Sequence, residues 1–277
     1  MRRTALLLIA LSVAATACHR QKDDNNVFSW SRELAPGGTL RIRDLNGAIS
    51  VVPAPDGKTA RVQAAAHWRR GDPRRDLKFV ALSQGNDATI CVHWGTGTCT
   101  ATEYTNRRAG GLSNWFMKRS TDATVDFTVE VPAGTRVDVS TANGEVAVTA
   151  QAPVLARTIN GSVHVATAIG PVAAATVNGT VDVRMTTLSG PGDVRAETTN
   201  GDASAYVPQA LDASVTLRTT NGDVSNAFGL AATGSRKNRV EGVLGTGSRV
   251  VSVRTTNGSA RLGALDAMGK IIGATAP

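Results

Sequence analysis

Aromatic residues and cysteines are scarce in this chain of 277 residues. Aromatic residues make up 4% of the sequence and there are three cysteines, against 28 glycines. A composition with few bulky side chains and many glycines is typical of a β-protein built from small and β-branched residues with many tight turns. The length permits one elongated domain or two ordinary ones.

Recognisable catalytic and metal-binding motifs are also missing. His19, His67, His93 and His164 lack the His-x-x-x-His spacing of a metal site, and the sequence has no Gly-x-Ser-x-Gly elbow and no phosphate-binding loop. The sequence therefore predicts a non-enzymatic protein without a cofactor or a metal. His93 alternates with Cys91 in a predicted strand, where we expect it to be exposed or half-buried.

A basic run interleaved with aromatic residues is absent, which argues against nucleic acid as a partner. The formal net charge is +8. A positive surface could contact anionic lipid headgroups or glycans, but excess charge alone is a weak indicator of a partner.

The N-terminal segment predicts export. Residues 1–3 are basic, and residues 5–14 form an apolar run too short to span a bilayer. Residues 15–18, Ala-Thr-Ala-Cys, resemble a bacterial lipobox, with Ala15 where that pattern prefers leucine. We expect residues 1–17 to be a signal peptide and Cys18 to carry the lipid, so that the protein is anchored in the bacterial envelope on a periplasmic or outer-membrane face. Cleavage before Cys18 without lipidation is the alternative.

The remaining two cysteines predict a disulfide. In an exported protein an odd thiol requires an explanation, and lipidation of Cys18 leaves Cys91 and Cys99 to pair. We expect this bond to close a hairpin around residues 94–97. Residues 18–27 then contain the lipidated cysteine and a short polar tether.

Asn-Gly pairs recur through the chain. They stand at Asn46-Gly47, Asn143-Gly144, Asn160-Gly161, Asn178-Gly179, Asn200-Gly201, Asn221-Gly222 and Asn257-Gly258. The steps after Asn143 are 17, 18, 22, 21 and 36 residues, and the last step is twice 18. This spacing predicts a repeat of about 17–22 residues, with one degenerate copy near residues 240–242.

The residues around each pair follow one template. Apolar residues stand six and four positions before the asparagine, threonine stands two before it except at Asp44, and apolar residues follow the glycine at two and four. This period-2 alternation predicts two strands per repeat, each with one buried face. An Asn-Gly pair suits a type I′ hairpin turn, which would give an antiparallel β-meander, and it equally suits a solenoid corner.

Two features favour stacked coils over hairpins. Ala156, Ala174 and Ala196 occupy one inward column in consecutive repeats, as expected around a narrow interior. The threonine column is also more constant than hairpin chemistry requires. We therefore predict an all-β fold, a parallel β-helix or solenoid, with the seven Asn-Gly pairs at its corners.

Three segments resemble a known family. Residues 125–148 (VDFTVEVPAGTRVDVSTANGEVAV) look like the core signature of the bacterial "putative adhesin" domains, whose function is unknown. Residues 37–52 (GGTLRIRDLNGAISVV) resemble the opening strand pair of that family, and residues 245–262 (GTGSRVVSVRTTNGSARL) its closing repeat. The resemblance extends over residues 28–265 and implies a right-handed β-helix of the envelope. It implies no catalytic residue and no ligand.

The organisation that follows has three parts after the tether. Residues 28–136 are expected to form N-terminal strands or a cap with the disulfide hairpin and a loop, residues 137–265 the repeat solenoid, and residues 266–277 a C-terminal tail. The stretch 68–119, with the loop at 106–111, breaks the repeat. We expect it to be a cap with a loop, and the alternative is a binding loop at one edge.

Two outward columns are candidates for function. Arg43, Arg157, Arg218 and Arg254 stand three positions before an asparagine and form a candidate binding face for an acidic glycan or a phospholipid. The same column predicts that Arg218 pairs with Glu197 across coils.

Carboxylates occupy the second outward column. Asp202 and Asp223 directly follow an Asn-Gly pair, and as neighbours on adjacent coils they could share a cation or raise one pKa. Solvated turn residues are the favoured interpretation of both.

The sequence as a whole predicts a lipid-anchored cell-envelope solenoid that acts as an adhesin-like interaction or scaffold module. One alternative is a polysaccharide-active enzyme or a glycan-binding protein that uses Asp202 and Asp223. Another is a partner protein in an envelope stress response. The expected partners are the membrane, through the lipid, and an envelope protein or an acidic glycan.

Overall fold

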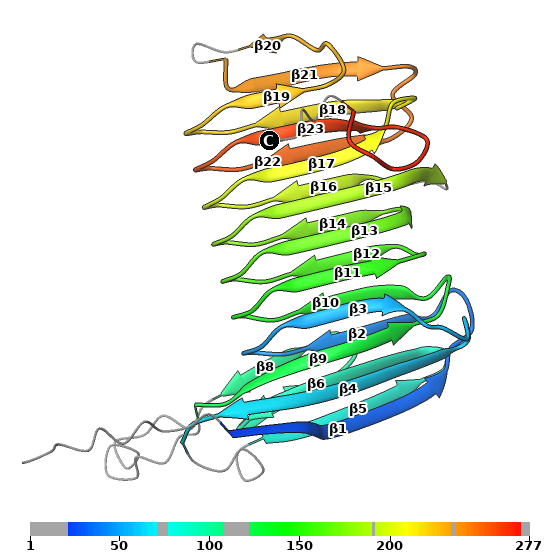
Figure 1. Ribbon diagram of the computed structural model, residues 1–277, viewed down its shortest axis with the longest axis vertical. Coiled ribbons are helices and arrows are strands. Elements are labelled where there is room, and N and C mark those ends of the chain that lie inside the picture. Colours follow the sequence, from blue (N-terminus) through cyan, green and yellow to red (C-terminus); the bar gives the residue numbers. More distant parts are fainter. Residues whose placement is uncertain (1–21, 71–76, 108–121, 190–191, 234–236, 273–277) are drawn as a thin grey trace, which may run out of the picture.

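Two long β-sheets run the length of the molecule and share one core (Figure 1). The computed structural model describes residues 22–70, 77–107, 122–189, 192–233 and 237–272. Every regular element in this part of the chain is a β-strand. Because residues 1–21 lie outside it, the predicted signal peptide and Cys18 are not described.

The first sheet has ten strands and the second has eleven. The first sheet runs in the order β1 (Lys22–Glu33), β4 (Thr59–Trp68), β9 (Thr124–Val131), β3 (Ile49–Pro53), β11 (Val146–Ala150), β13 (Val163–Ile169), β15 (Val181–Ser189), β17 (Ala203–Pro208), β23 (Ala260–Leu265) and β19 (Val224–Asn226). The second runs in the order β5 (Leu77–Gln84), β6 (Asp87–Trp94), β2 (Thr39–Arg43), β10 (Arg136–Ser140), β12 (Val154–Arg157), β14 (Val172–Ala175), β16 (Val194–Glu197), β22 (Val250–Arg254), β18 (Ala213–Arg218), β21 (Arg239–Leu244) and β20 (Ala232–Thr233). A separate pair consists of β7 (Thr96–Cys99) and β8 (Tyr104–Arg107).

Each central coil consists of one strand from each sheet, joined at an Asn-Gly corner. Successive coils pair in parallel and in register, so that Val137 lies beside Val154 and Val146 beside Val163. The predicted parallel solenoid is therefore confirmed, and the meander of Asn-Gly hairpins is wrong. Antiparallel pairing is found at the two ends, among β1, β4 and β9, between β5 and β6, and among β18, β21 and β20.

The inward columns predicted from the period-2 pattern form the core. Ala156, Ala174 and Ala196 lie on adjacent strands and are almost completely buried. Larger aliphatic residues fill the same column toward both ends of the stack, with Ile42 on β2 and Leu217 on β18. The core is thus narrow in the middle and is filled mainly by valine and alanine side chains, as the shortage of aromatic residues requires.

The corners are connected from coil to coil by two side-chain ladders. At five corners the threonine Oγ1 donates to the carbonyl oxygen of a glycine in the neighbouring coil, at 2.8–3.0 Å; the donors are Thr158, Thr176, Thr198, Thr219 and Thr255. Beside them, asparagine Nδ2 groups donate to the Oδ1 of the next asparagine at 2.7–2.8 Å, from Asn160, Asn178, Asn200, Asn221 and Asn257. The backbone ladder leaves the glycine carbonyls without a donor, and the threonines supply one.

Glycine is required at each corner for a steric reason. The seven glycines have φ between 140° and 150°, and a Cβ at any of them would lie 1.9–2.2 Å from a backbone carbonyl oxygen of the adjacent coil. Only a residue without a side chain permits this approach.

The coils are not stacked in the order of the sequence. The corners follow one another as Asn46, Asn143, Asn160, Asn178, Asn200, Asn257 and Asn221. The C-terminal coil of β22 and β23 thus lies between the coil of β16 and β17 and the coil of β18 and β19, as Figure 1 shows.

The degenerate repeat predicted near residues 240–242 is therefore wrong. These residues belong to β21, which pairs antiparallel with β18 instead of forming a coil. The 36-residue step from Asn221 to Asn257 contains this strand. β21 pairs with one edge of β18 before the chain crosses to the other edge, where β22 pairs.

The disulfide between Cys91 and Cys99 is present, as predicted, but the hairpin expected around residues 94–97 is wrong. After Trp94 the chain bends, and β7 pairs with β8. The β7–β8 pair covers the outer face of β6, and the Tyr104 hydroxyl donates to the Val92 carbonyl at 2.7 Å. His93 is buried for this reason, contrary to the expectation of an exposed or half-buried residue.

The N-terminal end differs from the predicted boundaries in one respect. Because β1 begins at Lys22, residues 22–27 of the predicted tether form part of a strand. Most of the predicted loop at 106–111 lies outside the described residues. Phe28 and Phe79 stack with ring centroids 4.9 Å apart and help to close this end of the core.

We expect Gly179→Ala to destabilise the protein by more than ~2 kcal/mol, because its Cβ would meet the Gly161 carbonyl oxygen at 2.1 Å. Chemical denaturation measures the effect. Gly57→Ala is the matched control, since Gly57 also has positive φ but no atom lies within 4 Å of the added Cβ. It should cost about 1–2 kcal/mol, the price of the left-handed conformation alone. Equal losses in the two variants would contradict the close-approach argument.

We expect the free energy of unfolding to depend on pH because Asp44 is a buried carboxyl group. Burial raises its pKa to about 7 from an ordinary value of 3.8, against hydrogen bonds from the amides of Leu45 and Asn46 and from Thr141 that favour the ionised form. The folded protein therefore binds a proton more tightly than the unfolded chain, and stability falls as the pH rises from about 4 to 7. At ~1.4 kcal/mol per pKa unit, the loss is on the order of a few kcal/mol.

The test compares the wild type with Asp44→Asn by denaturant unfolding between pH 5 and pH 8. Burial lowers the pKa of His93, which makes stability rise with pH in part of this window, so the difference between the two proteins is the quantity of interest. The wild type should lose stability relative to the variant as the pH rises. Parallel curves for the two proteins would rule out a titrating Asp44.

Candidate interaction faces

The four predicted arginines lie in one outward column of the second sheet, but they do not form one continuous face. Across the strands the column reads Arg43, Ser140, Arg157, Ala175, Glu197, Arg254, Arg218 and Arg239. Small residues isolate Arg157, so the arginines fall into an N-terminal and a C-terminal group.

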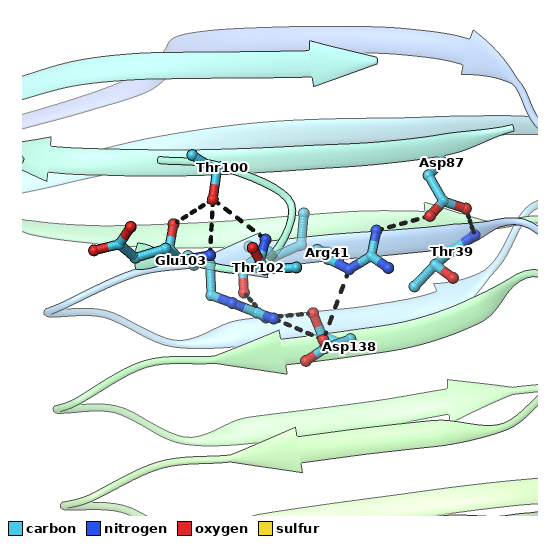
Figure 2. Close-up of polar contacts among 9 residues, drawn as sticks. Thr39, Arg41, Asp87, Thr100, Thr102, Glu103 and Asp138 are labelled. Atoms are coloured by element: carbon cyan, nitrogen blue, oxygen red, sulfur yellow. Dashed lines mark hydrogen bonds and ion pairs between the residues drawn. The ribbon is translucent and has the colours of Figure 1, made fainter. Parts of the chain in front are cut away.

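Arg43, in the N-terminal group, is held by the protein itself. Its guanidinium donates to Oδ2 of Asp138 at 2.6 Å and to the carbonyl oxygen of the same residue at 2.8 Å. The neighbouring Arg41 donates to Asp87 at 3.0 Å (Figure 2). Burial opposes ionisation of Asp87, but the hydrogen bonds from Arg41 and from the Thr39 amide outweigh it and lower its pKa. These groups satisfy one another and offer little to a ligand.

The C-terminal group is different. Arg239, Arg218 and Arg254 lie side by side on β21, β18 and β22, and we call these three residues the arginine row. All three are exposed. Arg239 forms an ion pair with Glu241, whereas the guanidinium groups of Arg218 and Arg254 have no hydrogen bond or ion pair among the described residues.

The predicted pairing of Arg218 with Glu197 is wrong. The C-terminal coil places Arg254 between them, so the neighbours of Arg218 are Arg254 and Arg239. Glu197 lies beside Arg254 in register, but no ion pair joins the two.

The arginine row includes two copies of one pentapeptide. Residues 218–222 and 254–258 both read Arg-Thr-Thr-Asn-Gly, and they are direct neighbours in the stack. In each copy the first threonine points inward and is buried, whereas the second, Thr220 or Thr256, is exposed at the corner. On the other side of the C-terminal coil, residues 197–201 read Glu-Thr-Thr-Asn-Gly.

Asp202 and Asp223 are not neighbours, contrary to the arrangement that would let them share a cation. Ser259 of the intervening coil lies between them, and its amide donates to Oδ1 of Asp202 at 2.7 Å. Within the described ranges, no group of three His, Cys, Asp or Glu side chains could hold a metal ion. The arrangement in which these two carboxylates share one cation is therefore not formed.

A cavity of about 260 Å³, which was not predicted from the sequence, lies on the first sheet. It is lined by Tyr206, Ser225, Arg261, Ile271 and Ile272, among others. The tyrosine ring lies over Gly263, which leaves no room for a Cβ there, and the Arg184 guanidinium lies 5.5 Å from the ring centroid. Tyr206 is itself buried, so its ring is no open platform for a ligand.

The described part of the chain contains no helix that is long and apolar enough to cross a membrane.

The sequence matches a protein family over its central and C-terminal part. The family model described as Toastrack DUF4097 matches residues 118–262, more than half of the chain. No curated protein matches the sequence.

Two solved structures match most of this chain at low identity. A "putative cell adhesion protein" from Clostridium sporogenes gives a TM-score of 0.46 at 11% identity, covering 88% of this chain and 100% of that one. A "putative adhesin" from Bacteroides fragilis gives 0.40 at 12% identity, covering 85% and 96%. Likenesses at this level carry no argument about function.

We expect Arg43→Met to destabilise the protein by about 1.5–3 kcal/mol, because it removes two charged hydrogen bonds and leaves the carboxylate of Asp138 with Arg41 at 4.0 Å. Arg157→Met is the matched control from the same column; its side chain is exposed and has no partner among the described residues, so the substitution should cost less than ~0.5 kcal/mol. Thermal or urea unfolding measures both. Similar losses would mean that the Asp138 contact does not stabilise the fold.

Proposed function

We propose, from the premise that the chain belongs to the Toastrack DUF4097 family, that it is a non-enzymatic, lipid-anchored solenoid that acts as an adhesin-like interaction or scaffold module of the bacterial envelope. The observation that carries the proposal is the distribution of polar groups. Equivalent outward positions recur in register from coil to coil, and within the described ranges no group of three His, Cys, Asp or Glu side chains could hold a metal ion.

The repeat itself supports an interaction role. Parallel strands place equivalent side chains about 4.8 Å apart along each outward column. The backbone, threonine and asparagine ladders fix these columns, so little conformational entropy is lost when a partner binds. Such a surface suits a partner that is itself extended and repetitive, as concave or flat solenoid surfaces generally do.

The proposed anchor would hold the N-terminal end close to the membrane. Cys18 is four residues before Lys22, where β1 begins, so the connection spans at most about 14 Å. The first sheet has ten strands, so its last strand, β19, lies nine strand spacings or roughly 43 Å from β1. The anchor and the arginine row would thus be at opposite ends of the molecule.

The anchor is tested by changing Cys18 to Ala and following the protein in fractionated cells and in radiolabelled palmitate incorporation. We expect the wild type to take up label and to sediment with membranes, and the variant to do neither. The control is Arg157→Met, an exposed substitution that leaves Cys18 in place and should behave as the wild type does. A Cys18→Ala protein that still fractionates with membranes as tightly as the wild type would refute the lipid anchor.

A further inference from the structure

The two Arg-Thr-Thr-Asn-Gly copies present an unusual surface for a self-contained fold. Arg218 and Arg254 extend from adjacent parallel strands in register, about 4.8 Å apart at the backbone. Their guanidinium groups have like charge, and the described residues give neither of them a hydrogen-bonded partner. By contrast, Arg43 in the same column is fully engaged by Asp138. Two unpaired arginines held next to each other can each donate hydrogen bonds to an acidic group of a ligand.

The corner beside these arginines consists of hydrogen-bonding groups. Thr220 and Thr256 are exposed next to Arg218 and Arg254 on the same two strands. Farther toward the N-terminal end, the same corner column carries exposed Ile159 (49% exposed) and Val177 (41% exposed) instead. The change from aliphatic residues to threonine begins at Thr199, on the neighbouring coil that carries Glu197, and continues through the two coils with the unpaired arginines. The C-terminal part of this edge therefore suits a ligand with both hydroxyl and acidic groups.

An unpaired hydroxyl group under the same face provides a second, independent observation. Ser252 lies on β22 two residues before Arg254, beside Thr216 of β18 and Arg195 of β16. It is only 4% exposed, and its Oγ has no hydrogen-bond partner. Burying a hydroxyl group without a hydrogen-bond partner costs free energy, so nearly all buried hydroxyl groups in native structures have a partner.

We propose that this surface, formed by Arg218, Thr220, Arg254 and Thr256, binds the acidic groups of an anionic polysaccharide, one acidic group at each arginine. The planar guanidinium can donate two parallel hydrogen bonds to a carboxylate or a phosphate. The threonine hydroxyls can pair with sugar hydroxyls. The proposal rests on the proposed envelope location, where such polymers are encountered.

A polysaccharide fits this surface better than an anionic membrane does. The four residues include no apolar side chain that could enter a bilayer. They also lie near the end of the stack remote from β1, which the proposed anchor would hold at the lipid. Electrostatic attraction to lipid headgroups falls off within a Debye length of about 8 Å at physiological salt, far less than the length of the solenoid.

The test measures binding of the full mature chain, carrying Cys18→Ala so that it is lipid-free, to polygalacturonate and to phosphomannan by calorimetry. We expect binding to at least one polymer and a loss of at least tenfold in affinity for Arg218→Met and for Arg254→Met. Arg157→Met, from the same column but outside the surface, should bind as the parent does. Lysine at 218 and 254 should restore only part of the affinity, because it keeps the charge but not the two-pronged geometry. Unchanged melting temperatures show that the variants are folded.

Three results would overturn the proposal. They are failure of the parent protein to bind either polymer, an equal loss of affinity in Arg157→Met, and binding only to vesicles of phosphatidylcholine and phosphatidylglycerol. The anchor is tested separately by fractionation. If the wild type takes up no palmitate but the Cys18→Ala chain binds polymer through Arg218 and Arg254, the site is upheld and the anchored location is refuted. If the wild type is anchored but the Cys18→Ala chain binds no polymer, the anchor is upheld and the site is refuted.

Discussion

The close approach of one coil to the next at the Asn-Gly corner is the constraint on which the other features depend. A missing Cβ lets each glycine lie against a carbonyl of the adjacent coil, and the threonine two residues before the asparagine donates to a glycine carbonyl that the backbone ladder leaves free. Both requirements are steric or hydrogen-bonding requirements of the stack itself. They fix three positions of each repeat and leave the two outward positions, one and three before the asparagine, free to vary with function.

Asp44 occupies the threonine position at the first corner, where the threonine ladder begins. The segment next to the first Asn-Gly corner is the start of β9, which has no such pair, and a Cβ on Gly47 would meet the Val125 carbonyl instead of another glycine. At this corner a carboxyl group replaces threonine, is buried, and leaves one oxygen without a partner. At this corner the glycine is still required by the close approach of the neighbouring backbone, but the threonine hydrogen bond is missing. Burial of the Asp44 carboxyl group raises its pKa.

Local pattern was sufficient to predict the coil but not the order of the coils. Val137, Ala156 and Thr158 are buried as their spacing predicts, because a period-2 pattern beside a glycine corner depends only on neighbouring residues. The stacking order depends on long-range pairing between edges that are almost identical in sequence. Nothing in residues 254–258 distinguishes them from residues 218–222, so no local signal placed the last coil inside the stack. The burial of His93 was missed for a related reason, since it depends on β7 and β8 folding back over β6.

The order of the coils decides the chemistry of the surface. A degenerate repeat between the two Arg-Thr-Thr-Asn-Gly copies would have separated them, whereas the return strand β21 lets them stack directly. The inserted coil also keeps Asp202 away from Asp223, which removes a carboxylate pair and leaves an arginine pair. Arg254 and Thr256 belong to the coil of β22 and β23, whose strands are hydrogen-bonded on both edges, so this half of the surface does not fray as a terminal coil would. Recognition of a repeating anion requires cationic side chains at a fixed spacing that are not already paired within the protein. In this solenoid the order of the coils brings two such side chains, Arg218 and Arg254, side by side.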